Sequence, residues 1–149
     1  MTNLISVSIS KNIEIVFRLE ADLPDVRGGT AELRQVVMNL VANAADAIGD
    51  DGGTITIQTG LGEPSPMPEA ETSVEHGERC DPSVHLRVTD DGLGMDARTL
   101  EKIFDPFFTT KFTGRGLGLA ATLGIVRGHG GGIRVESAPG RGTTFHLYL

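Results

Sequence analysis

The sequence predicts an α+β fold, a two-layer sandwich in which helices cover one face of a mixed sheet of about five strands. The prediction depends on three observations. Several segments alternate apolar and polar residues, as half-buried strands do, and residues 30–48 have the 3.6-residue period of an amphipathic helix. The chain has 149 residues, 39% of them hydrophobic, which is enough to bury one core, so we expect a single domain over residues 1–149.

The N-terminal half is expected to contain three strands and one long helix. These are strands over residues 3–9, 11–20 and 52–60 and a helix over residues 30–48. Thr30 is expected to cap the helix, and Gly49 to end it. Residues 61–82 contain several prolines and glycines and have no period, so we interpret them as a surface insert.

The C-terminal half is expected to contain two helices and three strands. These are a strand over residues 83–90, a short helix from Asp96 to about Ile103, a helix over residues 117–128, and strands over residues 131–137 and 142–149. Asp96 has the side chain of a helix cap, and the segment "APGRG" is typical of a hairpin turn between the last two strands. Residues 104–116 are expected to form a long loop.

Composition and charge exclude several classes of protein. The net charge of −7 argues against a general nucleic-acid binder. No run of about 18 apolar residues is present, and the first residues do not have the pattern of a signal peptide, so we expect a cytoplasmic domain with no direct membrane contact. The one cysteine cannot form an internal disulfide, which favours a reducing compartment.

A stripe of polar side chains runs along the predicted helix of residues 30–48, directly beside its apolar face. The stripe consists of Glu32, Gln35, Asn39, Asn43 and Asp46. Asparagine is a poor helix former, because its side chain competes for backbone hydrogen bonds. Two asparagines four residues apart therefore indicate a contact with a ligand, although the same pattern also fits a solvated polar shoulder.

Two glycine-rich segments point to a ligand that approaches the backbone closely. In "DDGLG", Asp90 ends a predicted strand beside Gly92 and Gly94, where a planar ligand with an exocyclic amine could lie; a plain turn is the alternative. In "GRGLGLA", alternating glycines precede a helix, whose N-terminus can bind phosphate, although the same glycines also fit a flexible hinge. More than half of the 20 glycines lie between Gly92 and Gly142.

The segment "FDPFFTTK" lies between the two glycine-rich segments. Phe104, Phe107 and Phe108 are expected to pin a mobile loop, or lid, by burying aromatic area. Lys111 and the hydroxyl groups beside it are suited to contact phosphate oxygens.

Taken together, five segments resemble the N, G1, F, G2 and G3 boxes of the histidine-kinase catalytic ATP-binding domain. In chain order they are "VVMNLVANAADAI", "DDGLGM", "IFDPFFTTK", "GRGLGLA" and "GRGTTFHLYL". The resemblance covers residues 28–149 and is closest to the nitrogen-regulation type and its hybrid relatives. It implies the ATP-binding sandwich shared with type II topoisomerases, mismatch-repair ATPases and the large heat-shock chaperone. In that fold, the segment before residue 11 is often the end of a helix.

The resemblance also implies roles for individual residues. Asn43 would bind Mg²⁺, Asp90 would bind the adenine amine, Gly92 and Gly94 would shape the adenine pocket, and Thr143 would lie near Asp90. The residues implied in the lid and in contacts to the nucleotide are Asp46, Lys111, Gly114, Arg115, Gly116, Leu117 and Gly118. The cofactors implied are ATP and Mg²⁺, and one amide oxygen suffices for that ion, which keeps several waters and also binds phosphates.

Asn39 bears on the reaction type, because relatives that hydrolyse ATP have a water-activating glutamate there. An amide is no general base, although it can orient a water or a phosphate, so transfer to an external nucleophile is favoured, with Asn39, Asn43 and Lys111 as the catalytic residues. None of the four histidines lies in the helical context of a phosphoacceptor. The acceptor is therefore expected on a separate dimeric helical domain, with a response regulator downstream.

Two other functions remain open at this point. One is a non-enzymatic nucleotide-binding module, whose lid moves when ATP binds. The other is an anti-sigma-type kinase, which transfers phosphate to a serine of a partner. The leading prediction is the catalytic ATP-binding domain of a two-component sensor histidine kinase.

Overall fold

A computed structural model describes residues 12–62, 72–77, 83–111 and 114–149. Six of its strands form one mixed sheet with the order β1-β2-β4-β6-β5-β3. The strands are β1 (Ile13–Arg18), β2 (Gly53–Leu61), β3 (Thr72–Gly77), β4 (Val84–Asp90), β5 (Gly132–Ser137) and β6 (Thr143–Tyr148). Strand β1 pairs with β2 in parallel, and every other pair is antiparallel.

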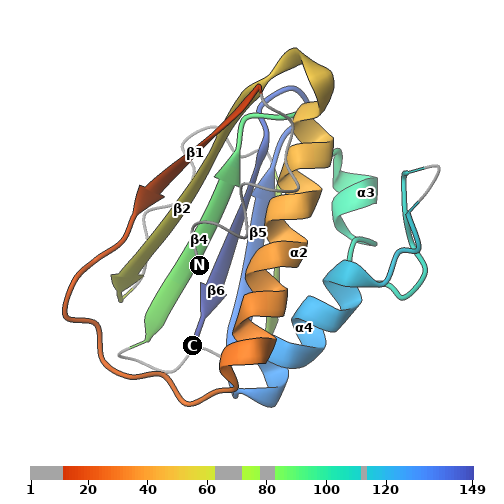
Figure 1. Cartoon of the computed structure of the whole chain (residues 1–149). Helices are drawn as coiled ribbons and strands as arrows, with labels where there is room; N and C mark the ends of the chain where they lie inside the picture. The colour runs from red at the N-terminus through yellow and green to blue at the C-terminus, as the bar shows by residue number, and fades with distance from the viewer. Residues whose placement is uncertain (1–11, 63–71, 78–82, 112–113) are drawn as a thin grey trace.

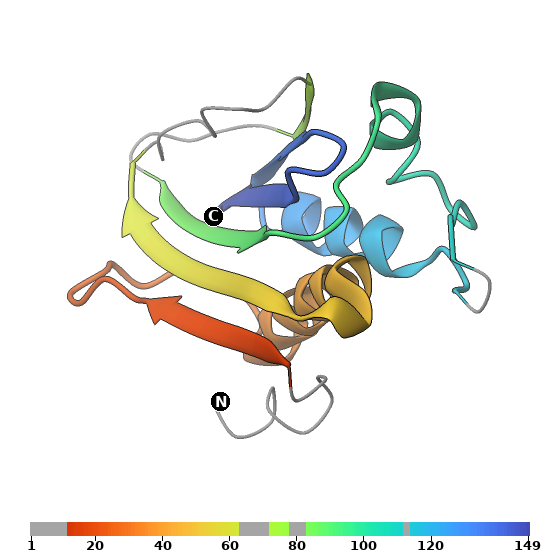
Figure 2. The same cartoon turned by 90° about the horizontal axis from the view of Figure 1, so that it is seen from above.

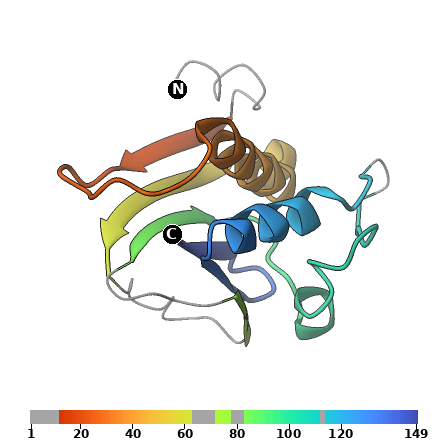
Figure 3. The same ribbon diagram turned by 90° about the horizontal axis from the view of Figure 1, so that it is seen from below.

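The helices lie on one face of this sheet, which confirms the predicted α+β sandwich (Figures 1 and 2). They are α2 (Thr30–Ile48), α3 (Ala97–Leu100) and α4 (Gly118–Gly128), with the short 3-10 helix η1 (Gly49–Asp51) after α2. Helices α2 and α4 pack side by side against the curved sheet, as the view from below shows (Figure 3). Burial between the sheet and these two helices forms the core.

The edge strand β3 corrects the interpretation of residues 61–82. Thr72–Gly77 pairs with β5 along its whole length, with Val74 opposite Val135. The five strands expected after residue 10 are present, β3 is a sixth that was not expected, and β2 also extends to Leu61. An edge strand is held on one side by backbone hydrogen bonds, which need no alternating side-chain pattern, so periodicity did not reveal it. The strand predicted over residues 3–9 lies outside the described residues.

Helix α2 has the predicted length but a different cap. Its N-cap residue is Gly29 rather than Thr30, no side chain caps it, and Leu33 N donates to Gly29 O at 3.0 Å. At the other end, Gly49 has φ 69° and its N–H donates to Ala45 O, which confirms the predicted stop. The buried side chains of the helix are Val36, Leu40, Val41, Ala44 and Ile48. Their burial fixes the rotation of α2 about its axis, and hence the direction of the polar stripe.

Helix α3 is shorter than predicted, and α4 agrees to within one residue. Asp96 caps α3 by accepting from Thr99 N at 2.8 Å, as expected, but regular helix ends at Leu100 and a series of turns follows. The described residues 104–111 and 114–116, here called the lid, contain no regular helix or strand, and Phe107 N donates to Gly116 O at 2.9 Å. The lid leads directly into the N-terminus of α4.

The β5–β6 hairpin contains two glycines that offer a matched test of packing. Gly140 and Gly142 have nearly equal positive φ angles of 73° and 78°, but only a Cβ on Gly142 would overlap the backbone of Asp90. We expect Gly140→Ala to cost about 1–2 kcal/mol of stability for its left-handed backbone. Gly142→Ala should cost about 1–3 kcal/mol more, because the added methyl group forces neighbouring backbone apart. Urea unfolding of the two variants measures the difference, and equal losses would contradict the close approach of the hairpin to β4.

Candidate functional site

A cavity of about 650 Å³ opens between α2, the N-terminus of α4, the lid and the ends of β4 and β6. Its lining includes eleven residues that the sequence singled out as contacts, namely Asn43, Asp46, Asp90, Gly94, Lys111, Gly114, Arg115, Gly116, Leu117, Gly118 and Thr143. Segments that are far apart along the chain therefore meet at one cavity, as their predicted roles require.

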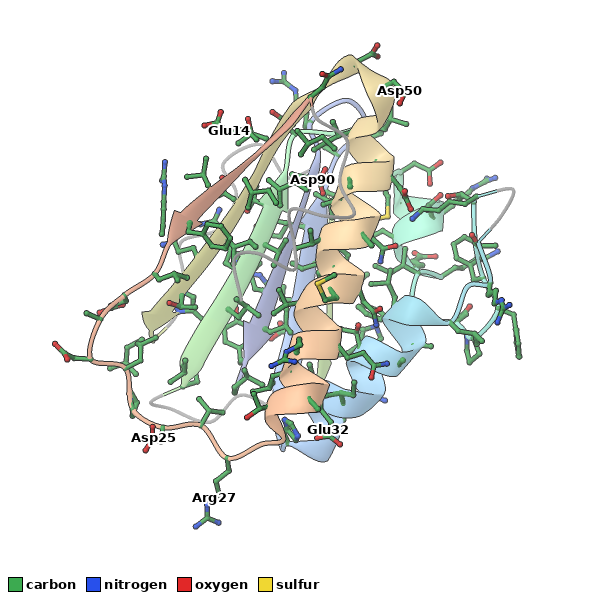
Figure 4. All side chains as sticks on the ribbon, in the orientation of Figure 1. Glu14, Asp25, Arg27, Glu32, Asp50 and Asp90 are labelled. Atoms are coloured by element: carbon green, nitrogen blue, oxygen red, sulfur yellow. The ribbon has the colours of Figure 1, made fainter. Side chains whose placement is uncertain are left out.

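Asp90 is the buried polar group at one end of this cavity. It is the last residue of β4, is 5% exposed and lies beside α2, as its labelled side chain shows (Figure 4). Burial raises the pKa of this carboxyl to about 6, and hydrogen bonds from the backbone N–H groups of Gly92 and Thr143 oppose that rise. Such a group can accept a hydrogen bond from a ligand amine in a pocket that holds little water.

The backbone N–H groups of Gly92 and Thr143 donate hydrogen bonds to the carboxyl group of Asp90 and hold it in place. Gly92 N donates to Asp90 Oδ1 at 2.9 Å, and a Cβ on Gly92 would lie 2.6 Å from the carbonyl carbon of Ala47 in α2. Gly92 is thus a point of close approach between the loop after β4 and α2, and it is not among the lining residues. Thr143 lies directly opposite Asp90 in the β4–β6 pairing, which agrees with the expected proximity of the two residues.

Ser137 supports this end of the cavity and was missed by the sequence analysis. Its buried hydroxyl donates to Gly142 O at 2.9 Å, accepts from Met95 N at 2.9 Å, and lies 2.9 Å from Thr143 Oγ1. It therefore ties the loop after β4 to the β5–β6 hairpin and orients the Thr143 hydroxyl. A small hydroxyl at an inward position of a predicted strand was the only available signal, because the partners are distant in sequence.

The opposite end of the cavity carries the charged groups. Lys111 Nζ, from the lid, donates to Asn43 Oδ1 at 3.0 Å and to Asp46 Oδ2 at 2.6 Å. Both acceptors belong to the polar stripe of α2, so the stripe faces a ligand-sized space rather than solvent alone. The structure thus brings Asn43, Asp46 and Lys111 into direct contact.

Asn39, one turn earlier on the same stripe, points to a different neighbour. Its Nδ2 donates to Gly118 O at 3.2 Å and to Thr122 Oγ1 at 3.4 Å, both in α4. Asn39 does not appear in the cavity lining. In this structure its amide links the two helices that lie over the sheet.

The three phenylalanines of the lid differ in burial, which corrects the expectation that all of them act as anchors. Phe104 is buried and packs edge-on against His76 of β3, with ring centroids 5.0 Å apart, and Phe108 is half-buried in the cavity wall. Phe107 is 75% exposed, with φ 68°. The bend that returns the chain to Gly116 turns the Phe107 ring outward, so the lid is anchored by its neighbours.

Further lining residues were not singled out as contacts by the sequence. They include Ala47, Met95, Thr99, Ile103, Leu119 and Phe145. All of these except Thr99 are apolar, which suits a planar, largely apolar group between the helices and the sheet. No helix in the described part of the chain is both long and apolar enough to cross a membrane.

Comparison with known proteins agrees with this geometry. Residues 28–149 match the family described as Histidine kinase-, DNA gyrase B-, and HSP90-like ATPase, and the chain belongs to that family. Membership of this ATPase family implies that the chain binds ATP. The match begins just before α2 and includes every residue that lines the cavity.

Relatives with curated names are sensor kinases. The chain is 38% identical to the sensor kinase CckA of Brucella abortus over 98% of this chain and 15% of that protein. It is 39% identical to the sensor histidine kinase ZraS of Escherichia coli over 94% of this chain and 26% of that protein. The chain thus spans about a quarter or less of these relatives.

Solved structures of histidine kinases have the same fold. The nucleotide-free catalytic domain of the histidine kinase ThkA superposes with a TM-score of 0.69 at 30% identity, over 93% of this chain and 78% of that one. A mycobacterial sensor histidine kinase, MprB, superposes with a TM-score of 0.68 at 29% identity, over 93% and 81% of the two chains.

The raised pKa of Asp90 predicts a stability effect with a definite sign. Between about pH 4 and pH 6 the folded chain retains a proton that the unfolded chain has lost, so this carboxyl lowers stability as pH rises through that window. Asp90→Asn should therefore stabilise the unliganded protein at pH 7.5 by up to about 3 kcal/mol, and much less at pH 4.5. Chemical unfolding of both proteins at the two pH values measures this, and a gain that does not grow with pH would contradict it.

Proposed function

We propose that this chain is the catalytic ATP-binding domain of a two-component sensor histidine kinase. It would bind Mg-ATP and transfer the γ-phosphoryl group to a histidine on a separate dimerisation domain. The observation that carries the proposal is the cavity, with the buried carboxylate of Asp90 at one end and the Asn43, Asp46 and Lys111 cluster at the other. Kinase names among the relatives support the same reading.

Asp90 is suited to recognise adenine. Its carboxylate would accept a hydrogen bond from the exocyclic amine, while Thr143, held by Ser137, would contribute a hydroxyl group beside it. Gly94 and Met95 would form the wall of the base pocket. Phosphates would then extend toward Lys111, Arg115 and the N-terminus of α4, where free N–H groups favour anions.

Residues at the other end fit a divalent cation. The Lys111 ammonium already occupies a position between two oxygens, Asn43 Oδ1 and Asp46 Oδ2, so this position accepts positive charge. Amide and carboxylate oxygens are ligands that Mg²⁺ takes, together with waters and phosphates. When bound, Mg²⁺ would neutralise charge on the phosphates, and Asn43 is the residue proposed to hold it.

The placement of the histidines supports an external acceptor. His85 and His146 are buried in β4 and β6, and His76 lies in β3. His129 follows α4 and pairs with Glu32 at 2.8 Å. None of these four positions offers a helical histidine to the cavity, so the nucleophile would come from the helical phosphoacceptor domain of the parent kinase.

Asn39 supports transfer over hydrolysis, because an amide cannot act as a general base toward water. Its contacts with α4 suggest that it contributes by holding the N-terminus of that helix at the phosphate end of the cavity. The parent protein would pass the phosphoryl group to a response regulator, and this domain would work in the cytoplasm without binding nucleic acid or membrane.

One experiment separates this function from the two alternatives. The chain is mixed with a helical phosphoacceptor domain of a related sensor kinase and with γ-labelled ATP, and the product is treated with acid and with alkali. Acid-labile, alkali-stable label on the helical domain supports a histidine kinase. Acid-stable label on a serine would indicate the anti-sigma-type kinase, and nucleotide binding without transfer would indicate a sensor module.

Asp90→Asn should weaken ATP binding while leaving the fold intact. A hydrogen bond to a charged group contributes about 1.5–3 kcal/mol, so the affinity should fall by roughly ten-fold or more. GTP should lose less than ATP, because it presents a carbonyl where adenine has an amine. Calorimetric titration with ATP, adenosine and GTP measures the change, and an unchanged ATP affinity would refute the adenine assignment.

Asn43→Ala should abolish most Mg²⁺-dependent phosphotransfer and leave adenosine binding nearly intact. The side chain belongs to the polar stripe rather than to the buried face of α2, so circular dichroism should show a folded protein. Asn43→Asp is the matched control, since it retains an oxygen for the metal. An equal loss of adenosine binding would mean that Asn43 shapes the base pocket instead.

A further inference from the structure

Lys111 occupies a position that two residues of α2 define together. Asn43 and Asp46 are three residues apart, so both side chains project from the same side of the helix. Their oxygens converge on one nitrogen, Lys111 Nζ, at 3.0 and 2.6 Å. A single positive charge from the lid thus lies between an amide oxygen and a carboxylate.

A metal ion held by both Asn43 Oδ1 and Asp46 Oδ2 would take the position between these two oxygens that the ammonium nitrogen has now. Amide and carboxylate oxygens are ligands that such an ion takes. Two cations in that one position would also repel each other strongly. Occupancy by Lys111 and occupancy by a divalent ion are therefore mutually exclusive.

We propose that Lys111 is a placeholder for the divalent cation, and that metal binding between Asn43 and Asp46 expels the lysine and releases the lid from α2. The proposal rests on the proposed function only in that the metal arrives with ATP. Asp46 acts here as a positioning residue: its carboxylate attracts the ammonium group when metal is absent and the metal ion afterwards.

Release of Lys111 would remove its contacts with Asn43 and Asp46, which link the lid to α2. The other contacts described within the lid, from Phe107 to Gly116 and between Thr109 and Lys111, are internal to it and do not tie it to α2. Once expelled, the lysine would be free to move toward phosphate oxygens in the same cavity, which Lys111, Arg115 and Gly116 all line. Metal and lysine would then act in sequence on the nucleotide.

The expected effect is modest, because the pair is partly open to solvent. The Lys111 side chain is 37% exposed and that of Asp46 is 59% exposed. Partly exposed ion pairs contribute little, so loss of the competing lysine should strengthen metal binding about two- to five-fold.

Titration with Mn²⁺ alone, without nucleotide, tests the exchange directly. Broadening of the backbone amide signals of α2 around Asn43 reports binding of the paramagnetic ion to the full chain. We expect Lys111→Ala to lower the apparent dissociation constant about two- to five-fold. Lys102→Ala, which removes the same charge from an exposed turn, should leave it unchanged and serves as the matched control.

A second readout follows the lysine itself. Adding Mg²⁺ to the unmodified protein should move the Lys111 side-chain Cε signal toward the value of a solvated lysine, with no change at Lys102. Unchanged Mn²⁺ affinity in Lys111→Ala, equal effects of the two lysine variants, or no Mn²⁺ binding near Asn43 in either protein would overturn the exchange. Failure of the proposed function appears separately, as absence of ATP binding or of phosphotransfer.

Discussion

The packing of α2 on the sheet is the contact on which the site depends. Val36, Leu40 and Ala44 are buried against the inner faces of the central strands, and this burial fixes the rotation of the helix. Because the polar stripe lies beside the apolar face on the same helix, this rotation also fixes the direction in which the stripe points. Asn39 meets α4, and Asn43 and Asp46 meet the cavity and the lid. A rotation of the helix by one residue would separate all of these contacts.

The end of the cavity that contains Asp90 buries a carboxyl group at a cost in electrostatic free energy. The β4–β6 pairing sets Asp90 opposite Thr143, and the loop after β4 closes over it through Gly92 and Leu93, whose N–H donates to Ala47 O at 3.0 Å. Burial disfavours the charged carboxylate, and only two backbone N–H groups offset that cost. A ligand that donates a hydrogen bond to this carboxylate stabilises its charged form. Ligand binding would therefore recover part of the free energy that burial of the charged group costs in the unliganded protein.

At the opposite end of the cavity, the charges of the lid and of α2 are already paired. Here the carboxylate of Asp46 is partly exposed and already has a cation beside it. Under the proposed exchange, a bound cation would replace the ammonium group of Lys111 instead of filling an unsatisfied site. Because the lid contributes that ammonium group, the proposal couples the contact between the lid and α2 to the cation that lies between Asn43 and Asp46.

Local patterns were sufficient for most of the fold. The apolar period and Gly49 predicted α2 to the residue at its C-terminus, and alternation predicted β1, β2, β4, β5 and β6. The patterns did not predict β3, because backbone pairing with β5 and not a side-chain pattern defines that strand. They also predicted the wrong N-cap of α2, because Gly29 caps the helix without a side-chain hydrogen bond. Phe107 is the clearest failure, because its exposure depends on a bend that returns the chain to Gly116.

Sequence by itself singled out the candidate residues that the cavity brings together. Spacing along one helix predicted that Asn43 and Asp46 share a face, and the glycine-rich and phenylalanine-rich segments pointed to Asp90 and Lys111. Only the tertiary structure decided their partners: Lys111 with Asn43 and Asp46, Asn39 with α4, and Ser137 with Thr143. The physical reason is that hydrogen bonds and ion pairs act over a few ångströms, and only the packing of distant segments brings those groups within that range.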